Sequence, residues 1–332
     1  MSKIAVIGAG SWGTTFSKLL ADGGNEVMLW SRREEVAAEI NSSHRNETYL
    51  PGVNLSENIV ASTNVEEVLS GASQVYISVP SQSLRANLEA WGKFIPEDAV
   101  VVSLMKGVEQ KTGLRMSQVI KECGISEDRV VVLSGPNLAL EIAAEQPAAS
   151  VAASSSQASA MAVAKASSNS YFTTFTNNDV IGTEFGGILK NLIAVAIGIV
   201  NGVGYGQNTK ASIMTRGLSE ISRFASAFGA KPETMVGLAG LGDLIATSES
   251  PLSRNHKAGE MLGQGFSKKE VLEKLSQTAE ALVSVSTVLE LARDKNIAMP
   301  IVEQVELVIE GKMDPKDIAP HLTHMSDTPQ GE

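Results

Sequence analysis

The sequence contains little cysteine, few aromatic residues and no excess of basic residues. Cys123 is the single cysteine among 332 residues, so no internal disulfide can form, which suits a reducing cytosol. Acidic residues number 37 against 27 basic ones, and the resulting net charge of −10 argues against binding to nucleic acid. Any bound phosphate therefore needs a local cluster of cations or backbone N–H donors.

The sequence also lacks a segment expected to cross a membrane. The chain passes from MSK directly into an apolar strand, without the apolar stretch and cleavage site of a signal peptide. The longest apolar run, residues 191–200, is too short to span a bilayer, and we interpret it as a buried helix. We expect a cytoplasmic protein without a membrane span. The four histidines show no metal-ligand spacing, so we expect no metal site.

The first half of the chain alternates strands with helices. Nearly continuous apolar runs predict strands of a parallel sheet covered on both faces, at residues 3–7, 26–30, 74–80, 99–105, 129–135, 147–153 and 171–176. Glycines follow the first helical stretch, as they commonly do where a helix ends. The pattern predicts a doubly wound, mostly parallel α/β domain of the Rossmann type over residues 1–178.

The strand pattern stops after about residue 178. Apolar residues then recur at helical spacing in several long segments. We therefore predict that residues 179–332 form a second, all-α domain that carries the substrate and catalytic residues.

A glycine-rich turn follows the first predicted strand. KIAVIGAGSWG places Gly8, Gly10 and Gly13 in the spacing G-x-G-x-x-G between a strand and a helix, the context that a dinucleotide-binding turn requires. The first glycine permits a sharp turn, the second lets backbone approach a pyrophosphate, and the third lets helix and strand pack closely. A turn without a ligand is the alternative, which this context disfavours. We predict a nicotinamide dinucleotide at this turn.

The end of the second predicted strand bears on the choice of cofactor. An NAD site usually has Asp or Glu there, about 20 residues after the glycines, to hold the ribose hydroxyls. This chain has Arg32 and Arg33 instead, and Glu34 and Glu35 are expected to begin the next helix. Arginine can pair with a 2′-phosphate, so NADPH is favoured over NADH. Two solvated surface arginines are the alternative.

Further motifs lie beyond the glycine turn. SLMKG (103–107) and LSGPNLALEI (133–142) run past the ends of predicted strands, where open α/β sheets bind ligands. GGILKN (186–191), GLAGLGDL (237–244) and SPLSRNHKAGEMLGQG (250–265) lie in the helical half. With GAGSWGT, LWSR, YLPG and GQNTKASIMTRGLSE, these motifs closely resemble, almost end to end, bacterial NAD(P)-dependent glycerol-3-phosphate dehydrogenases. The resemblance implies reduction of dihydroxyacetone phosphate to sn-glycerol 3-phosphate for phospholipid synthesis, by a homodimer.

The resemblance also implies roles for individual residues. Lys190 matches the catalytic lysine. Substrate contacts are implied for Lys106, Gly135, Asn137, Lys190, Asp243, Ser253, Arg254 and Asn255. Besides the three glycines, cofactor contacts are implied for Ser11, Trp12, Arg32, Arg33, Lys106, Ala139, Arg254 and Glu280. The sequence departs from the family at Asn137, where Ser or Thr is more frequent, and at Ile188, where the residue is usually small.

The residue types suit the chemistry of ketone reduction. Addition of hydride to a ketone develops negative charge on oxygen, which a buried lysine can stabilise and protonate. We expect Lys190 to do so, with Lys106 nearby and Asp243 orienting it or accepting a hydrogen bond from substrate. Ser253 is a natural N-cap, and Arg254 and Asn255 would lie in the first turn of the helix that binds the substrate phosphate.

Two other functions remain open from the sequence. One is a related two-domain dehydrogenase that acts on another hydroxy acid or on a sugar-acid phosphate. The other is a non-catalytic NADPH-binding sensor, which would keep the glycine turn but would not need Lys190 or Asp243.

Overall fold

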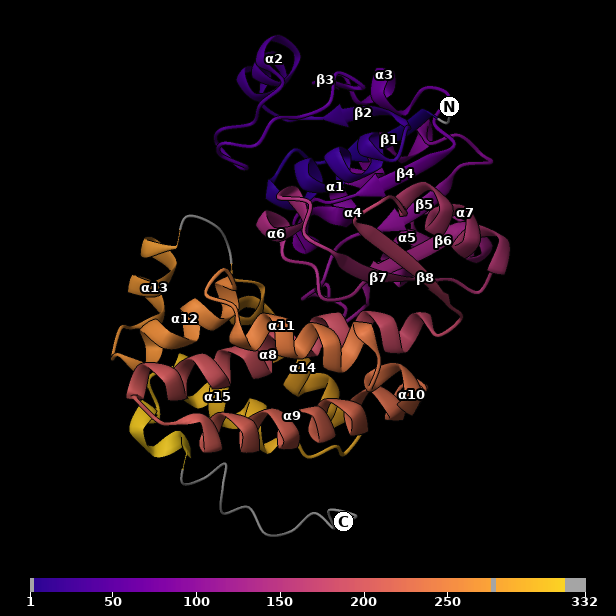
Figure 1. Ribbon diagram of the computed structural model, residues 1–332. Coiled ribbons are helices and arrows are strands. Elements are labelled where there is room, and N and C mark those ends of the chain that lie inside the picture. The colour runs from indigo at the N-terminus through magenta and orange to yellow at the C-terminus, as the bar shows by residue number, and fades with distance from the viewer. Residues whose placement is uncertain (1–2, 276–278, 320–332) are drawn as a thin grey trace. The chain divides into compact units, whose positions relative to one another are not determined.

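The protein is described from a computed structural model that places residues 3–275 and 279–319 (Figure 1). The chain divides into two compact units, one reaching to Glu184 and the other beginning at Phe185. The sequence predicted a division between residues 178 and 179, directly before helix α8 (Val180–Val203), and the compact units divide inside the first turns of that helix.

The first unit is built on an eight-stranded sheet with the strand order β3-β2-β1-β4-β5-β6-β7-β8. Neighbouring strands are parallel except β6 and β7, which pair antiparallel. The predicted doubly wound, mostly parallel fold is therefore confirmed. The strands are β1 (Lys3–Ile7), β2 (Glu26–Trp30), β3 (Ile59–Ser62), β4 (Gln74–Ile77), β5 (Val100–Ser103), β6 (Val130–Ser134), β7 (Ala148–Ala153) and β8 (Phe172–Asn177).

Strand β3 was not predicted from the sequence. It has four residues and lies at the edge of the sheet, paired only with β2. Its residues alternate between buried and more exposed, so it lacks the continuous apolar run that marks the central strands. The other predicted strands are confirmed, with boundaries that are one to three residues shorter at some ends, while β8 ends one residue later than predicted.

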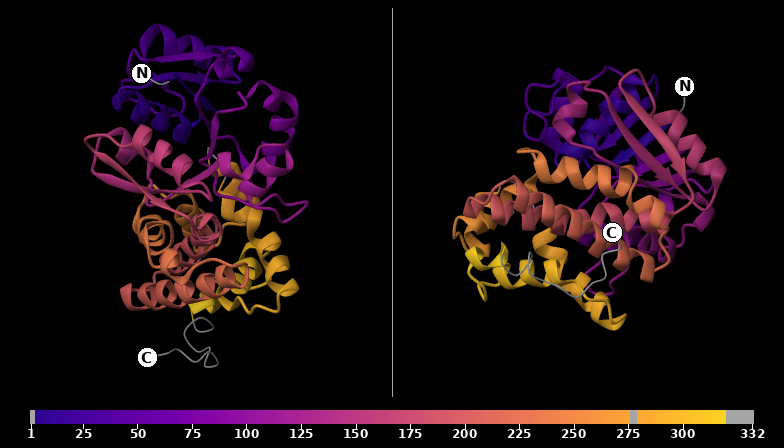
Figure 2. Two further views of the ribbon diagram at one scale, coloured as in Figure 1. Left: turned by 90° about the vertical axis from the view of Figure 1, so that its right-hand side faces the viewer. Right: turned by 60° about the horizontal axis from the view of Figure 1, so that its bottom comes forward.

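Helices cover both faces of this sheet (Figure 2). Ile4 and Val6 of β1 belong to one apolar cluster, and the alternate residues Ala5 and Ile7 belong to another. The helices are α1 (Ser11–Asp22), α2 (Glu34–Ser43), α3 (Val65–Leu69), α4 (Leu84–Trp91), α5 (Met116–Glu122), α6 (Ala139–Ala143) and α7 (Gln157–Ser167), with 3₁₀ turns at Ser81–Ser83, Gly92–Phe94 and Glu127–Arg129.

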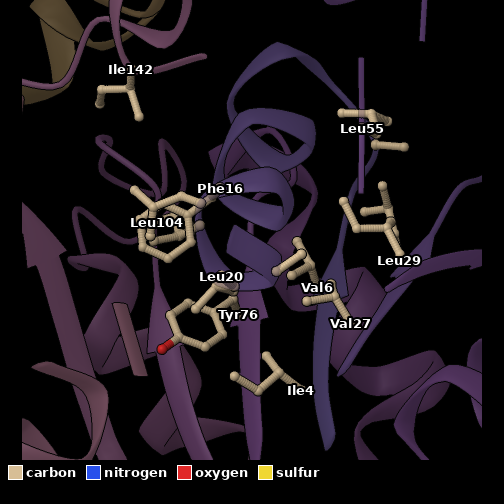
Figure 3. Close-up of a cluster of buried hydrophobic side chains, with 14 of the residues drawn as sticks. Ile4, Val6, Phe16, Leu20, Val27, Leu29, Leu55, Tyr76, Leu104 and Ile142 are labelled. Carbon is tan, nitrogen blue, oxygen red and sulfur yellow. The ribbon is translucent and has the colours of Figure 1, made fainter. Parts of the chain in front are cut away.

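Helix α1 lies over the first of these clusters (Figure 3). The centroid of the Phe16 ring lies 5.2 Å from the centroid of the Tyr76 ring on β4 and 6.4 Å from that of the Phe172 ring on β8. Burial of such aromatic side chains contributes about 1.5–3 kcal/mol each. The helix that follows the glycine turn is thus held against the sheet by its apolar face.

Within residues 185–275 and 279–319 the second unit contains helices joined by turns and loops and no strand, so the predicted all-α domain is confirmed. After α8 come α9 (Gln207–Ala227), α10 (Pro232–Met235), α11 (Asp243–Glu249), α12 (Arg254–Gly263), α13 (Lys268–Lys274), α14 (Glu280–Asp294) and α15 (Pro300–Ile309). A π-helical turn at Leu238–Gly242 leads into α11, and a 3₁₀ turn occupies Pro315–Asp317.

Helix α8 contains the apolar run that the sequence marked as a buried helix. With 24 residues it is long and apolar enough to cross a bilayer, but 83% of its most apolar window is buried inside the protein. Residues 192–197 are fully buried. The predicted buried helix is confirmed, and α8 is a core helix of the kind found in soluble proteins.

A buried carboxylate joins two helices of this unit. Glu220 on α9 accepts hydrogen bonds from the backbone N–H groups of Ile301, at 3.0 Å, and Val302, at 3.1 Å, in the first turn of α15. Burial raises the pKa of Glu220 to about 7, although these two donors and Arg223 act in the opposite direction; Glu303 adds to the rise.

The raised pKa predicts a dependence of stability on pH. Between pH 4.5 and about 7 the folded state binds more protons at Glu220 than the unfolded state, so stability falls as pH rises through this window. We expect the free energy of unfolding of Glu220→Gln, which cannot titrate, to lack this fall. Urea unfolding at pH 5, 6, 7 and 8 should show wild type losing up to about 1.4 kcal/mol per pH unit relative to the variant. If the free energies of unfolding of wild type and Glu220→Gln changed with pH in parallel, the pKa of Glu220 would not be raised in the folded protein.

Candidate functional site

The glycine turn between β1 and α1 has the geometry of a dinucleotide site. Gly8 has φ of +117°, and a Cβ atom there would lie 2.5 Å from the carbonyl oxygen of Ser78. A Cβ atom on Gly13 would lie 1.8 Å from the carbonyl oxygen of Gly8. The turn cannot hold side chains at these positions, because backbone fills the space.

The second glycine of the turn faces open space. Among the described residues, and apart from the neighbouring backbone, no atom lies within 4 Å of where a Cβ of Gly10 would be, and no described side chain caps α1, whose first turn holds no acidic residue. The N–H groups at this helix end can therefore receive an anion that approaches the backbone closely. The residues present fit the pyrophosphate of a dinucleotide.

Ser11 and Trp12 lie in the first turn of α1. The Ser11 hydroxyl donates a hydrogen bond to the carbonyl oxygen of Tyr49, at 2.5 Å. The half-buried Trp12 ring packs edge-on against Phe16, with 5.3 Å between ring centroids. These contacts fix the side chains on either side of the turn.

The two arginines after β2 differ in their surroundings. Arg32 is exposed. The Arg33 guanidinium lies over the Tyr49 ring, 4.9 Å from its centroid, and its Nε lies 3.5 Å from Glu35. One terminal nitrogen of Arg33 is buried without a hydrogen-bond partner among the described residues. As predicted, α2 begins at Glu34. The exposed Arg32 and the terminal nitrogen of Arg33 can therefore both donate hydrogen bonds to a phosphate.

The motifs after β5 and β6 are brought together at the carboxyl ends of these strands. Lys106 Nζ donates a hydrogen bond to the carbonyl oxygen of Gly135, at 3.1 Å. Gly135 lies so close to β7 that a Cβ atom there would be 3.0 Å from the Cα of Ser150. Lys106 and Gly135 therefore lie together beyond the carboxyl ends of β5 and β6, where open α/β sheets bind ligands.

Asn137 and Ala139 follow in the same segment. The Asn137 amide donates to the carbonyl oxygen of Ala149, at 3.3 Å, and its oxygen lies 3.1 Å from the Ser150 hydroxyl. This side chain is hydrogen-bonded to β7. Ala139 is the first residue of α6, and its carbonyl oxygen lies 3.4 Å from the Thr15 hydroxyl of α1.

A buried ionic cluster lies inside the helical unit. Lys190 Nζ of α8 is 2.9 Å from Asp243 Oδ1, and both side chains are almost fully buried, at 7% and 2% exposure. Lys190 also donates a hydrogen bond to the hydroxyl of Thr247, which in turn donates to Asp243 at 3.1 Å. The lysine ammonium is thus fixed in direction and paired with a carboxylate, as a buried charge requires.

The local sequence explains how Asp243 reaches Lys190. The π-helical turn Leu238–Gly242 places Asp243 at the start of α11. This turn lies directly against α8, because a Cβ atom on Gly186 would be 2.4 Å from the carbonyl oxygen of Ala239. Gly186 precedes Lys190 by about one helical turn, so close contact at the glycine brings the carboxylate to the lysine.

The start of α12 has the predicted cap. The Ser253 hydroxyl accepts a hydrogen bond from the backbone N–H of His256, at 3.2 Å, and Arg254 is the first, exposed residue of the helix. The buried Asn255 accepts a hydrogen bond from the N–H of Ala281, at 3.2 Å, in the first turn of α14. Glu280, half-buried, begins that helix. The first turns of two helices and a guanidinium therefore meet here, as an anion site requires.

Two residues of these sites were not found from the sequence. Thr247 joins Lys190 to Asp243, and its spacing of four residues from Asp243 on a predicted helix was a usable signal. Tyr49 joins Ser11 to Arg33; it lies in the YLPG motif, but no role was assigned to it, because its two partners come from other parts of the sequence.

Known proteins resemble the chain over nearly its whole length. Residues 3–160 match the model of the NAD-dependent glycerol-3-phosphate dehydrogenase N-terminus, and residues 179–320 match that of the C-terminus. A glycerol-3-phosphate dehydrogenase [NAD(P)+] of Leifsonia xyli is 59% identical over 98% of this chain and 89% of its own length. One of Streptomyces griseus is 50% identical over 93% of each chain.

A solved structure agrees with these relatives. The crystal structure of glycerol-3-phosphate dehydrogenase from Coxiella burnetii superposes with a TM-score of 0.91, at 34% identity, over 97% of this chain and 99% of that one. These relatives and this solved structure are all named glycerol-3-phosphate dehydrogenase. The chain belongs to the NAD-dependent glycerol-3-phosphate dehydrogenase family.

Proposed function

We propose that this protein reduces dihydroxyacetone phosphate reversibly to sn-glycerol 3-phosphate with NADPH or NADH, and that Lys190 is its general acid and base. The observation that carries the proposal is the buried Lys190–Asp243–Thr247 cluster. A sensor that only binds a dinucleotide would not need Lys190 or Asp243. The experiment that tests it is the replacement of Lys190, argued in the Discussion.

Lys190 can act on the carbonyl oxygen in two ways. Its ammonium attracts the negative charge that develops there when the reduced nicotinamide supplies a hydride, and it then transfers a proton to the alkoxide. Asp243 and Thr247 hold the Nζ atom in place, so little reorganisation is needed during the step. In the oxidation direction the neutral amine accepts the proton of the alcohol.

The substrate phosphate is assigned to the start of α12. Arg254 offers a planar, bidentate donor, and the N–H groups of the first helical turn add a favourable dipole. Ser253 and Asn255 hold this turn in place through the cap and through α14. Lys106, Gly135 and Asn137 are further proposed substrate contacts, and Glu280 and Ala139 are proposed cofactor contacts.

The exposed Arg32 gives a test of cofactor choice. We expect Arg32→Asp to weaken NADPH binding by about 1.5–3 kcal/mol, the value of a hydrogen bond to a charged group, while NADH binding changes little. Fluorescence titration with each cofactor measures both. Lys93→Asp makes the same change of charge at an exposed site that precedes the amino end of β5, whereas Arg32 follows the carboxyl end of β2, and it should leave both affinities unchanged. Equal losses of NADPH and NADH would mean that Arg32 does not contact the 2′-phosphate.

The protein's setting is inferred from the same chemistry. A glycerol 3-phosphate product supplies the starting unit of phospholipids. The buried α8 and the single cysteine suit a soluble enzyme of the cytoplasm. By resemblance to its family we propose a homodimer.

A further inference from the structure

Helices α8 and α12 touch through their backbones. A Cβ atom on Gly198 of α8 would lie 2.1 Å from the carbonyl oxygen of His256, and one on Gly259 of α12 would lie 2.2 Å from the carbonyl oxygen of Val195. Backbone atoms cannot rotate away as a side chain can. Any larger residue at either glycine must therefore push the two helices apart by about 1 Å.

The contact repeats one helical turn further along. A Cβ atom on Gly202 would lie 2.1 Å from the carbonyl oxygen of Glu260, and one on Gly263 would lie 2.2 Å from that of Ile199. We name Gly198, Gly202, Gly259 and Gly263 the glycine crossing. Two such contacts in a row fix the angle between the helices as well as their separation, which a single contact would not do.

The crossing lowers the stability of the helices that form it. Glycine in a helix interior is less stable than alanine, and helices that pack through side chains normally lie 8–10 Å apart. Alanine or larger residues would bury more apolar surface at a wider spacing. The close spacing of α8 and α12 therefore calls for a reason other than helix stability.

The two helices carry the two groups that must act on one substrate molecule. Lys190 is on α8, about two turns before Gly198, and Arg254 begins α12, two residues before the His256 carbonyl that Gly198 contacts. Lys190 meets the carbonyl group and Arg254 the phosphate. In dihydroxyacetone phosphate a single methylene separates the carbonyl carbon from the phosphate ester oxygen, so the two protein groups must stand close together.

We propose that the glycine crossing sets the distance between Lys190 and the start of α12, and that this distance fits the site to a three-carbon keto phosphate. The inference rests on the proposed function, in which Arg254 binds the phosphate. The glycines are positioning residues, because they touch neither substrate nor the reacting atoms. We expect a displaced α12 to misplace the phosphate more than the ammonium of Lys190, since the side-chain partners of Lys190 lie on α11 and not on α12.

Paired substrates test the proposal. The specificity constant kcat/KM is measured at saturating NADPH for dihydroxyacetone phosphate and for unphosphorylated dihydroxyacetone. For Gly198→Ala we expect kcat/KM to fall about 10–100-fold with the phosphorylated ketone, the cost of a 1 Å misplacement, and to change less than about twofold without the phosphate. A purely structural defect would lower both constants by the same factor.

Gly217→Ala is the matched control. Its Cβ atom would lie 2.6 Å from the side chain of Ile193 on α8, and the three atoms nearest to it all belong to Ile193, so it strains the packing of α9 on α8 rather than that of α12 on α8. For Gly217→Ala we expect the ratio of kcat/KM for dihydroxyacetone phosphate to kcat/KM for dihydroxyacetone to equal that of wild type. The proposal would be overturned if this ratio were unchanged in Gly198→Ala, or if it changed equally in Gly217→Ala.

Two more variants complete the experiment. If Gly198→Ala does not fold, Gly263→Ala at the far end of the crossing replaces it. We then expect a smaller fall of the ratio, and an unchanged ratio would again overturn the proposal.

Arg254→Ala distinguishes failure of the crossing proposal from failure of the phosphate assignment. If it abolishes the preference for the phosphorylated ketone while Gly198→Ala retains that preference, only the crossing proposal fails. If Arg254→Ala retains the preference, the phosphate assignment itself is wrong.

Discussion

Replacing Lys190 with methionine is expected to lower kcat for dihydroxyacetone phosphate about 10²–10⁴-fold, the range for loss of a positioned acid. Methionine keeps much of the apolar stem but removes the charge and the proton. Binding of NADPH, measured by fluorescence titration, should hardly change, because the glycine turn belongs to the first compact unit and Lys190 to the second.

The ion pair of Lys190 calls for a second variant. Methionine leaves the Asp243 carboxylate, which is only 2% exposed, without its cation, and such a loss costs about 3–5 kcal/mol. Lys190→Arg keeps a cation beside Asp243 but does not release a proton near neutral pH. We expect Lys190→Arg to retain more stability than Lys190→Met and still to lose most of kcat.

A matched lysine controls for loss of charge alone. Lys269, whose side chain is 85% exposed, has no place in the site, and Lys269→Met should keep wild-type kcat. A near-normal kcat in Lys190→Met would contradict its role as the acid, and Lys106 would then be the next residue to test.

Replacing Arg254 with alanine is expected to raise KM for dihydroxyacetone phosphate about 30- to 1,000-fold, the equivalent of about 2–4 kcal/mol of charge-assisted contact. The guanidinium lies at the N-terminus of α12, where its charge and the helix dipole act on the same phosphate. Because Arg254 is also a proposed cofactor contact, the measurement is made at saturating NADPH.

The controls for this variant lie on the same helix. Lys257→Ala removes an exposed cation one turn or less from Arg254 and should change KM little. Arg254→Lys keeps the charge but loses bidentate geometry, so we expect an intermediate KM. An Arg254→Ala enzyme with the wild-type KM would place the phosphate elsewhere.

Much of the fold could be predicted from the sequence, because its main elements carry strong local signals. The central strands are continuous apolar runs, and Gly8, Gly10 and Gly13 mark the passage from β1 to α1. The edge strand β3 was missed, because it is short and its buried residues alternate with more exposed ones. The antiparallel direction of β7 was not predicted either, since the direction of a strand depends on the connection before it rather than on its own residues.

The site residues that lie in recognisable sequence motifs could be predicted. Asp243 was singled out in its glycine-rich segment, and its contact with Lys190 agrees with one of the two roles considered for it. Thr247 and Tyr49 were missed, because their roles come from tertiary contacts between segments. The four glycines that join α8 to α12 are spaced regularly in each helix, yet only the structure shows that the two pairs meet.

Initial rates with dihydroxyacetone phosphate and each of NADPH and NADH test the central claim most directly. The proposed function predicts rapid oxidation of the reduced cofactor with this ketone, faster with NADPH than with NADH, and much slower oxidation with unphosphorylated dihydroxyacetone and with keto acids. Tight binding of NADPH without turnover of dihydroxyacetone phosphate would contradict it in favour of a sensor. Faster turnover of another keto substrate would contradict it in favour of a different dehydrogenase.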